Sequence, residues 1–278
     1  MQASPTILNR LRPGLGTLVA VEAEAARAGA AEEGLAAAFE AVSLVERLMH
    51  PQRGSDMQAL CTAACGVPLA VHPWTWEVLA LSRRLHGRSH GIFDPCLSTA
   101  DGRIGDLDLS RRGRVVCRAP VRIDLGGIAK GYAVDRAIDA LRSAGCTGGL
   151  VNAGGDLALF GARRRTILCS RPDGTAAALE LRSGAIASSD TAQPSRPPEH
   201  RGYYHAGDRA RPVSGQVTVV AHSAAIADGL TKCLLCGGHR LSRALLLAFG
   251  ARTLAPRAQK ARPRPRSSRV KSLLSSNH

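Results

Sequence analysis

Paired glycines divide the middle of this chain into segments that are too short for helices, and this feature restricts the fold more than any other. Residues 148–160 read GGLVNAGGDLALF, two apolar runs joined at Gly154–Gly155. Each run has the length of a β-strand, and adjacent glycines permit the positive φ angles of a tight turn. The sequence therefore predicts strands over 148–152 and 156–160.

Further elements are expected on both sides of this hairpin. We expect other strands at 15–23, 166–170, 177–182 and 216–221, and paired strands across 115–125 with a turn near Pro120. Apolar residues at helical spacing predict helices over 31–49, 73–86, 128–145, 224–236 and 239–248. Helices interspersed with hairpin-like strands are typical of the α+β class. The proline-rich segment 188–215 is expected to be a long loop that contributes to a site.

The positive charge of the chain is concentrated at its C-terminal end. The formal net charge is +15, and residues 252–278 contribute eight Lys and Arg side chains and no acid. Their alternation of Pro and Arg predicts a disordered basic tail that follows a folded domain of residues 1–251. Nucleic-acid binding is therefore not expected of the folded domain, although binding through the tail remains an alternative.

Three features that the sequence lacks bear on the cellular location of the protein. No apolar run has the roughly 18 residues that a membrane helix needs, and residues 1–18 contain no sustained apolar region of a signal peptide. Eight scattered cysteines do not suggest a disulfide framework. We expect a cytoplasmic protein without a membrane span.

The segment IDLGGIAKGYAVD, residues 123–135, is the first candidate for chemistry. A strand ends at Asp124, glycines follow at 126 and 127, and a helix begins with Lys130 in its first turns. Helix amides reinforced by a lysine can bind a phosphate or another anion. The alternative is a glycine-rich turn with no ligand.

The segment ADGLTK, residues 227–232, is the second candidate. Asp228 and Thr231 are three residues apart on one helix face, where a carboxylate and a hydroxyl could share a hard cation such as Mg²⁺. The alternative is an ordinary exposed acid near a helix start.

These segments together resemble a known family. GIFDP, IDLGGIAKGYAVDRA, VNAGGDLALFG, and VTVVA followed by ADGLTK are similar to the motifs of the ApbE family of FAD:protein FMN transferases, and the resemblance covers about residues 15–250. It implies an α+β, T-fold-like domain with antiparallel strands and packed helices. It also implies Mg²⁺-dependent transfer of FMN from FAD, as a substrate, to a Ser or Thr hydroxyl of an acceptor protein, with release of AMP. The family's acceptors carry a D-x-x-[ST]-G-A-T-like segment.

The resemblance assigns roles only to residues that match the motifs. The residues implied in FAD binding are Leu15, Ile92, Phe93, Asp94, Asp124 and Lys130. The residues implied in magnesium binding are Asp228, the Gly127 carbonyl and Thr231. His205 of the H-x-x-D pattern, which Asp208 completes, is the implied general base, with a histidine exposed on a loop as the alternative.

One departure from the family pattern concerns the metal site. The family commonly has a threonine four residues after the aspartate, whereas here Thr231 comes at three and Lys232 occupies the fourth place.

Two alternatives to transfer stay open: hydrolysis of FAD to FMN and AMP, and FAD binding without turnover. The sequence does not indicate the oligomeric state.

Overall fold

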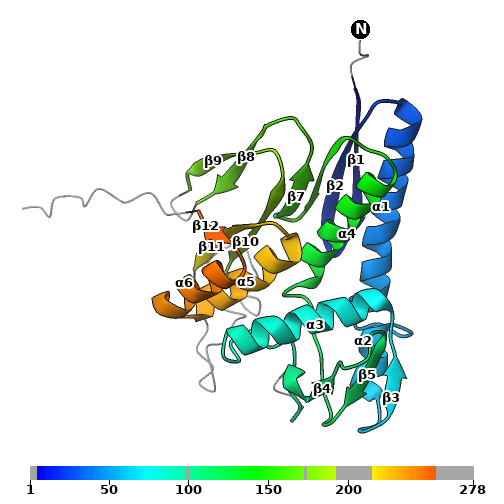
Figure 1. The fold of residues 1–278 in the computed structure, drawn as a ribbon, viewed down its shortest axis with the longest axis vertical. Helices are drawn as coiled ribbons and strands as arrows, with labels where there is room; N and C mark the ends of the chain where they lie inside the picture. Colours follow the sequence, from blue (N-terminus) through cyan, green and yellow to red (C-terminus); the bar gives the residue numbers. More distant parts are fainter. Residues whose placement is uncertain (1–4, 98–99, 172–173, 192–214, 255–278) are drawn as a thin grey trace, which may run out of the picture.

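A seven-stranded antiparallel sheet is the centre of the computed structural model, which describes residues 5–97, 100–171, 174–191 and 215–254 (Figure 1). In spatial order its strands are β1 (Thr6–Gly14), β2 (Thr17–Ala25), β6 (Gly148–Ala153), β7 (Asp156–Phe160), β10 (Gly184–Asp190), β11 (Gln216–Ala221) and β12 (Arg252–Thr253). Every neighbouring pair runs antiparallel. The predicted α+β class is therefore confirmed.

Three helices cover one face of this sheet: α1 (Ala28–Met49), α4 (Ala129–Ser143) and α5 (Ala224–Cys236). Leu35, Ala38 and Val42 recur at helical spacing on α1 and are buried against β2 and α4. Helix α5 is buried along most of its length, because it lies between the sheet and the helices α4 and α6 (His239–Ala248). These contacts place the first turns of α4 and α5 beside each other.

The opposite face of the sheet packs against the hairpin of β8 (Arg165–Ser170) and β9 (Ala176–Leu181). Leu159, Ile186 and Val220 from the sheet form a small core there with Cys169 of the hairpin. Both predicted strands of this hairpin are thereby confirmed.

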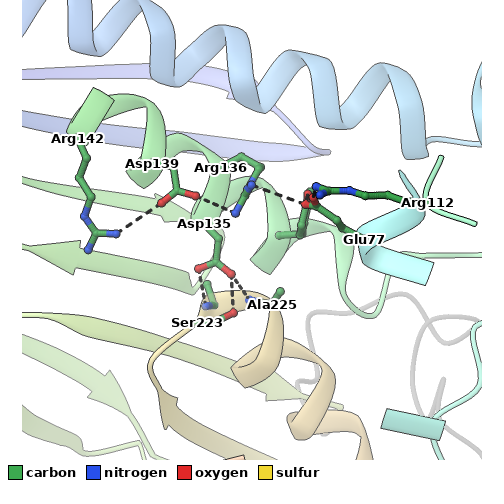
Figure 2. A network of polar contacts seen from close by, with 10 residues as sticks. Glu77, Arg112, Asp135, Arg136, Asp139, Arg142, Ser223 and Ala225 are labelled. Carbon is green, nitrogen blue, oxygen red and sulfur yellow. Dashed lines mark hydrogen bonds and ion pairs between the residues drawn. The ribbon is translucent and has the colours of Figure 1, made fainter. Parts of the chain in front are cut away.

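A smaller layer, drawn below the main sheet in Figure 1, is built around a second, three-stranded sheet. Its elements are α2 (Asp56–Thr62), β3 (Pro68–Ala70), α3 (Pro73–Arg88), a 3-10 turn (Ile104–Asp106), β4 (Leu107–Asp108) and β5 (Arg114–Cys117). Glu77 of α3 accepts hydrogen bonds of 2.6 Å from both Tyr132 Oη on α4 and Arg112 before β5 (Figure 2 labels Glu77 and Arg112). This carboxylate therefore ties the smaller layer to α4.

Two predictions about strands are wrong. Leu15 was expected in a strand, but Leu15 and Gly16, with φ of 56° and 70°, form the two-residue turn between β1 and β2, because a hairpin of this kind requires positive φ at both positions. The predicted pairing within 115–125 is absent among the described residues: β5 pairs with β3 and β4, and Ile123 makes only an isolated bridge to Cys96.

The ends of two predicted irregular segments also turn out to be strands. Residues 188–190 of the expected loop belong to β10, where Ser188 pairs with Thr218 through their hydroxyls at 2.8 Å rather than through apolar side chains. Residues 252–253 of the expected tail form β12 against β11. Residues 192–214 and 255–278 lie outside the described residues, so the remainder of both predictions stays untested. Among the helices that are described, none is both long and apolar enough to cross a membrane.

Candidate functional site

The glycine turn before α4 brings a lysine to the end of a buried strand. Asp124 Oδ1 accepts a hydrogen bond of 2.7 Å from the Gly126 amide, which shapes the turn that leads into α4. Lys130, in the first turn of this helix, pairs with Asp156 across 2.8 Å between Nζ and Oδ2. Asp156 is the first residue of β7 and follows the predicted Gly154–Gly155 turn, whose φ angles are 62° and 101°. The two glycine motifs therefore meet at one point.

A second pair of charges lies beside the first. Asp228 of α5 is fully buried, its Oδ1 pairs with Nζ of Lys232 one helical turn later, and its Oδ2 accepts a hydrogen bond of 3.2 Å from the Gly131 amide. The interpretation of Asp228 as an exposed acid near a helix start is thus wrong. Its carboxylate instead joins α5 to the first turn of α4.

The four charged groups form one electrostatic cluster, which we call the ionic cluster: Lys130, Asp156, Asp228 and Lys232. Burial and the Asp228 carboxylate raise the pKa of Asp156 to about 6, and the ammonium groups of Lys130 and Lys232 act in the opposite direction. Two carboxylates and two ammonium groups give the cluster no net charge above that pKa. Only the Lys130 side chain, 34% exposed, is readily accessible to solvent.

Backbone packing holds α4 and α5 together at this cluster. A Cβ atom added to Gly131 would lie only 2.3 Å from the Ala224 carbonyl oxygen, so the two chains approach as closely as glycine permits. Asp135, one turn further along α4, accepts hydrogen bonds from Ser223 Oγ at 2.6 Å and from the amides of Ala224 and Ala225 at 2.7 and 3.0 Å (Figure 2). Burial nevertheless raises the pKa of this carboxyl. The ionic cluster thus stands on a rigid junction of two helices.

Apolar groups border the cluster on one side. Ideal Cβ positions built on Gly127 and Gly229 would contact the Phe93 ring at 3.8 and 3.7 Å. The same position on Gly127 lies 3.6 Å from Cε of Lys232. The Lys232 side chain therefore passes along the glycine turn to reach Asp228.

The remaining residues implied by the resemblance are spread more widely. Leu15 lies in the turn between β1 and β2, at the same end of the strands as Gly154, because an ideal Cβ on Gly154 would lie 2.9 Å from Oγ1 of Thr17. Ile92 lies against Gly237, where α5 ends. Asp94 contacts other residues than those of the ionic cluster: its Oδ1 accepts hydrogen bonds from the amides of Cys96 and Ile104, and its Oδ2 lies 3.4 Å from His86 Nδ1. His205 lies outside the described residues.

The side chains at Asp228 do not fit a bound Mg²⁺ as they stand. Both carboxylate oxygens of Asp228 are engaged, and the hydroxyl of Thr231 is fully buried, donating to the Asp228 backbone carbonyl at 2.7 Å while lying 2.7 Å from Ser189 Oγ. In the part of the chain that the structure describes, no group of three or more His, Cys, Asp or Glu side chains is arranged so that it could hold a metal ion. Magnesium in proteins prefers carboxylate and phosphate oxygens with several waters, whereas here an ammonium lies on the carboxylate.

Sequence reasoning omitted three residues of this site. Lys232 was noted only as a departure, although an Asp and a Lys four residues apart on a helix are a common ion-pair spacing. Asp156 was predicted only as the first residue of the strand that follows the Gly154–Gly155 turn. Gly131 gave no signal of its own, because its role depends on the approach of a helix that lies about ninety residues away in sequence.

The fold and the ionic cluster define an α+β protein with a lysine at a helix start after a glycine turn, an arrangement suited to an anionic ligand such as a phosphate. The ApbE family model matches residues 15–251, and the chain belongs to the ApbE family.

Individual relatives agree with this assignment. An FAD:protein FMN transferase from Rhodobacter capsulatus is 28% identical over 174 residues, which make up 52% of this chain and 33% of that protein, so the match spans about a third of the relative's length. The solved Pseudomonas stutzeri flavinyl transferase ApbE, in its apo form, has a TM-score of 0.77 and 20% identity, covering 92% of this chain and 93% of that one. The flavin transferase ApbE from Vibrio cholerae has a TM-score of 0.71 and 20% identity, covering 89% and 92%. These likenesses confirm the expected ApbE-like fold.

Proposed function

We propose that this protein is a flavin transferase that moves FMN from FAD to a Ser or Thr hydroxyl of an acceptor protein and releases AMP. The observation that carries the proposal is the ionic cluster, which joins the glycine turn, the β6–β7 turn and α5 within the segment matched by the family model. The relative from Rhodobacter capsulatus is named for the same reaction. We expect the acceptor to carry a D-x-x-[ST]-G-A-T-like segment.

The reaction is a phosphoryl substitution on the FMN side of the FAD pyrophosphate. The acceptor hydroxyl oxygen forms a bond to that phosphorus, and the bond from the phosphorus to the bridging oxygen breaks, so that AMP leaves with the bridging oxygen. Such transfers depend on positioning and on neutralisation of the phosphate oxygens. We assign the binding of these oxygens to Lys130, because a lysine in the first turn of a helix attracts anions.

The hydroxyl proton needs an acceptor. We assign this role to His205, because an imidazole with an ordinary pKa of about 6.5 can take up a proton near neutral pH. His205→Gln should therefore slow transfer while FAD binding persists. Equal rates for this variant and the unchanged protein would remove His205 from the mechanism.

The direct test is to incubate the full chain with FAD and an acceptor fragment that carries a D-x-x-T-G-A-T segment, then to measure the fragment's intact mass and the free AMP. A matched fragment with the threonine replaced by alanine is the control. A gain of one FMN only on the threonine fragment, with one AMP released for each transfer, supports the proposal. AMP without a modified fragment would indicate hydrolysis, and bound FAD without either product would indicate a flavin-binding protein.

The magnesium that the resemblance implies is a variable of this assay rather than a step of the proposed mechanism. The reaction is run in parallel with Mg²⁺ and with EDTA. The comparison separates the transfer itself from the identity of the cation that supports it.

A further inference from the structure

The place where the resemblance implies a divalent cation is lined by a lysine side chain in this protein. The implied ligands are the Asp228 carboxylate and the Gly127 carbonyl, which belong to α5 and to the glycine turn. Lys232 pairs with Asp228 through its Nζ, and its Cε would lie 3.6 Å from an ideal Cβ built on Gly127. The Lys232 side chain therefore passes beside the glycine turn and ends on the carboxylate that would hold the metal.

The charges around Asp228 are already balanced without a metal. Asp156 and Asp228 supply two negative charges, and Lys130 and Lys232 supply two positive charges. The Lys232 side chain is only 9% exposed, so a divalent ion on Asp228 would have to share a buried site with an ammonium that had lost its partner. Like charges at short distance in a buried site repel strongly, which opposes such binding.

The other oxygen atoms near Asp228 are committed as well. Gly131 donates its amide to the second carboxylate oxygen, and the Thr231 hydroxyl, the third implied ligand, bonds to the Asp228 backbone carbonyl instead of facing the carboxylate. A metal ion would therefore have to replace several existing bonds at once.

We propose that the Lys232 ammonium is the resident cation of this site, so that the FAD pyrophosphate binds without a bound divalent ion. This inference rests on the proposed function for its choice of FAD. An ammonium carries three donors and can bind a carboxylate and a phosphate oxygen together. Lys130 and Lys232 would then supply, from the chain itself, the positive charge that a phosphoryl transfer needs as its leaving oxygen becomes negative.

The first test uses the unchanged full chain after removal of metals. Titration calorimetry with MgCl₂ alone should give no stoichiometric binding, and the FAD dissociation constant, measured by flavin fluorescence, should agree in EDTA and in Mg²⁺ within about twofold. Stoichiometric Mg²⁺ binding that Asp228→Asn removes would overturn the proposal. So would a loss of FAD affinity of about tenfold or more in EDTA.

The second test changes the lysine. Lys232→Thr should weaken FAD binding in EDTA by about 10- to 100-fold, the loss expected for a charged hydrogen bond, and Mg²⁺ should restore part of it because Asp228 is released. Arg243→Thr, which removes one positive charge from the exposed side of α6, is the matched control and should change neither value. Unchanged FAD affinity in a folded Lys232→Thr protein would overturn the proposal.

A variant that keeps the charge covers the case in which Lys232→Thr fails to fold. Lys232→Arg should retain FAD binding that is insensitive to EDTA, and a new requirement for Mg²⁺ would contradict the inference.

The acceptor assay separates the two proposals. FAD binding that is insensitive to EDTA, without any transfer, would contradict the proposed transferase activity and support Lys232 as the resident cation. Transfer that occurs only with Mg²⁺ would support the transferase activity and contradict the role of Lys232. Absence of FAD binding under both conditions would overturn both.

Discussion

Replacement of Gly131 by alanine should destabilise this protein, although alanine is the better helix former. Gly131 lies in the first turn of α4, where this helix meets the start of α5. An alanine Cβ would lie 2.3 Å from the Ala224 oxygen and 2.8 Å from the Ala225 nitrogen, both backbone atoms. Ordinary contacts need about 3.5 Å, so the two helices would have to separate by about 1 Å.

The cost of this separation follows from what holds the helices together. Asp135 binds the first turn of α5 through bonds of 2.6 to 3.0 Å, and a shift of this size would weaken them. Overpacking costs about 1–3 kcal/mol, and weakened hydrogen bonds to a buried carboxylate cost about 1.5–3 kcal/mol. The helix propensity of alanine returns about 1 kcal/mol, so the net loss in the free energy of unfolding is about 1.5–5 kcal/mol.

The measurement is urea unfolding followed by circular dichroism, with Gly87→Ala as the matched control. Gly87 is also helical, near the end of α3, but an added Cβ there meets nothing within 4 Å, so this variant should gain up to about 1 kcal/mol. Gly131→Ala should also weaken FAD binding, because its amide donates to Asp228. A Gly131→Ala protein as stable as the unchanged protein, beside a normal control, would refute this account of the α4–α5 junction.

The remaining predictions concern the charged groups near that junction. Lys130→Ala should raise the FAD dissociation constant by about 10- to 100-fold in titration calorimetry, and an unchanged constant would contradict its phosphate role. The pKa of Asp156 is raised to about 6, so this carboxyl takes up a proton as the pH falls from 7 to 5, and the net charge of the ionic cluster becomes positive. Because FAD is an anion, it should bind more tightly at pH 5 than at pH 7. Asp156→Asn should abolish this difference, and a persisting difference would assign it to another group. Asp135→Ala removes the acceptor of three hydrogen bonds and should lower stability by about 2–4 kcal/mol in thermal unfolding; a loss below about 0.5 kcal/mol would show that water replaces the carboxylate.

The sequence predicted those helices and strands whose apolar side chains follow a single helical or strand periodicity. The predicted ranges of α5 and α6 agree with the structure, because both helices carry apolar residues at helical spacing between clear breaks. The whole of β10 was missed, since Ser188 and Ser189 satisfy their strand positions through hydroxyl bonds and the segment shows no apolar alternation. Leu15 was placed in a strand because a leucine gives no sign of the positive φ that its turn requires.

The site was predictable to the extent that it depends on short motifs. The glycine turn and Lys130 were found because they are contiguous, and Asp228 was a candidate both from its spacing to Thr231 and from the resemblance. The partner of each charge was not found, since Asp156 and Lys130 are joined by the fold and not by spacing. Lys232 shows the limit most clearly: the sequence displayed the residue, but only the three-dimensional path of its side chain connects it with Gly127.

The outer strand β1 has a consequence for how copies of this protein behave when they are crowded. It pairs on one side only, with β2, and its backbone on the other side borders no further described strand. The exposed backbone of an edge strand can form hydrogen bonds with strands of other molecules, which leads to aggregation. Here Pro13 lacks the amide that a recruited strand would need, and Arg12 adds a positive charge beside it, whereas the charge of Arg10 is paired with Glu32. The exposed Leu11 lies next to Arg12, so the proline and this charge oppose aggregation at a position where the hydrophobicity of the strand would otherwise promote it.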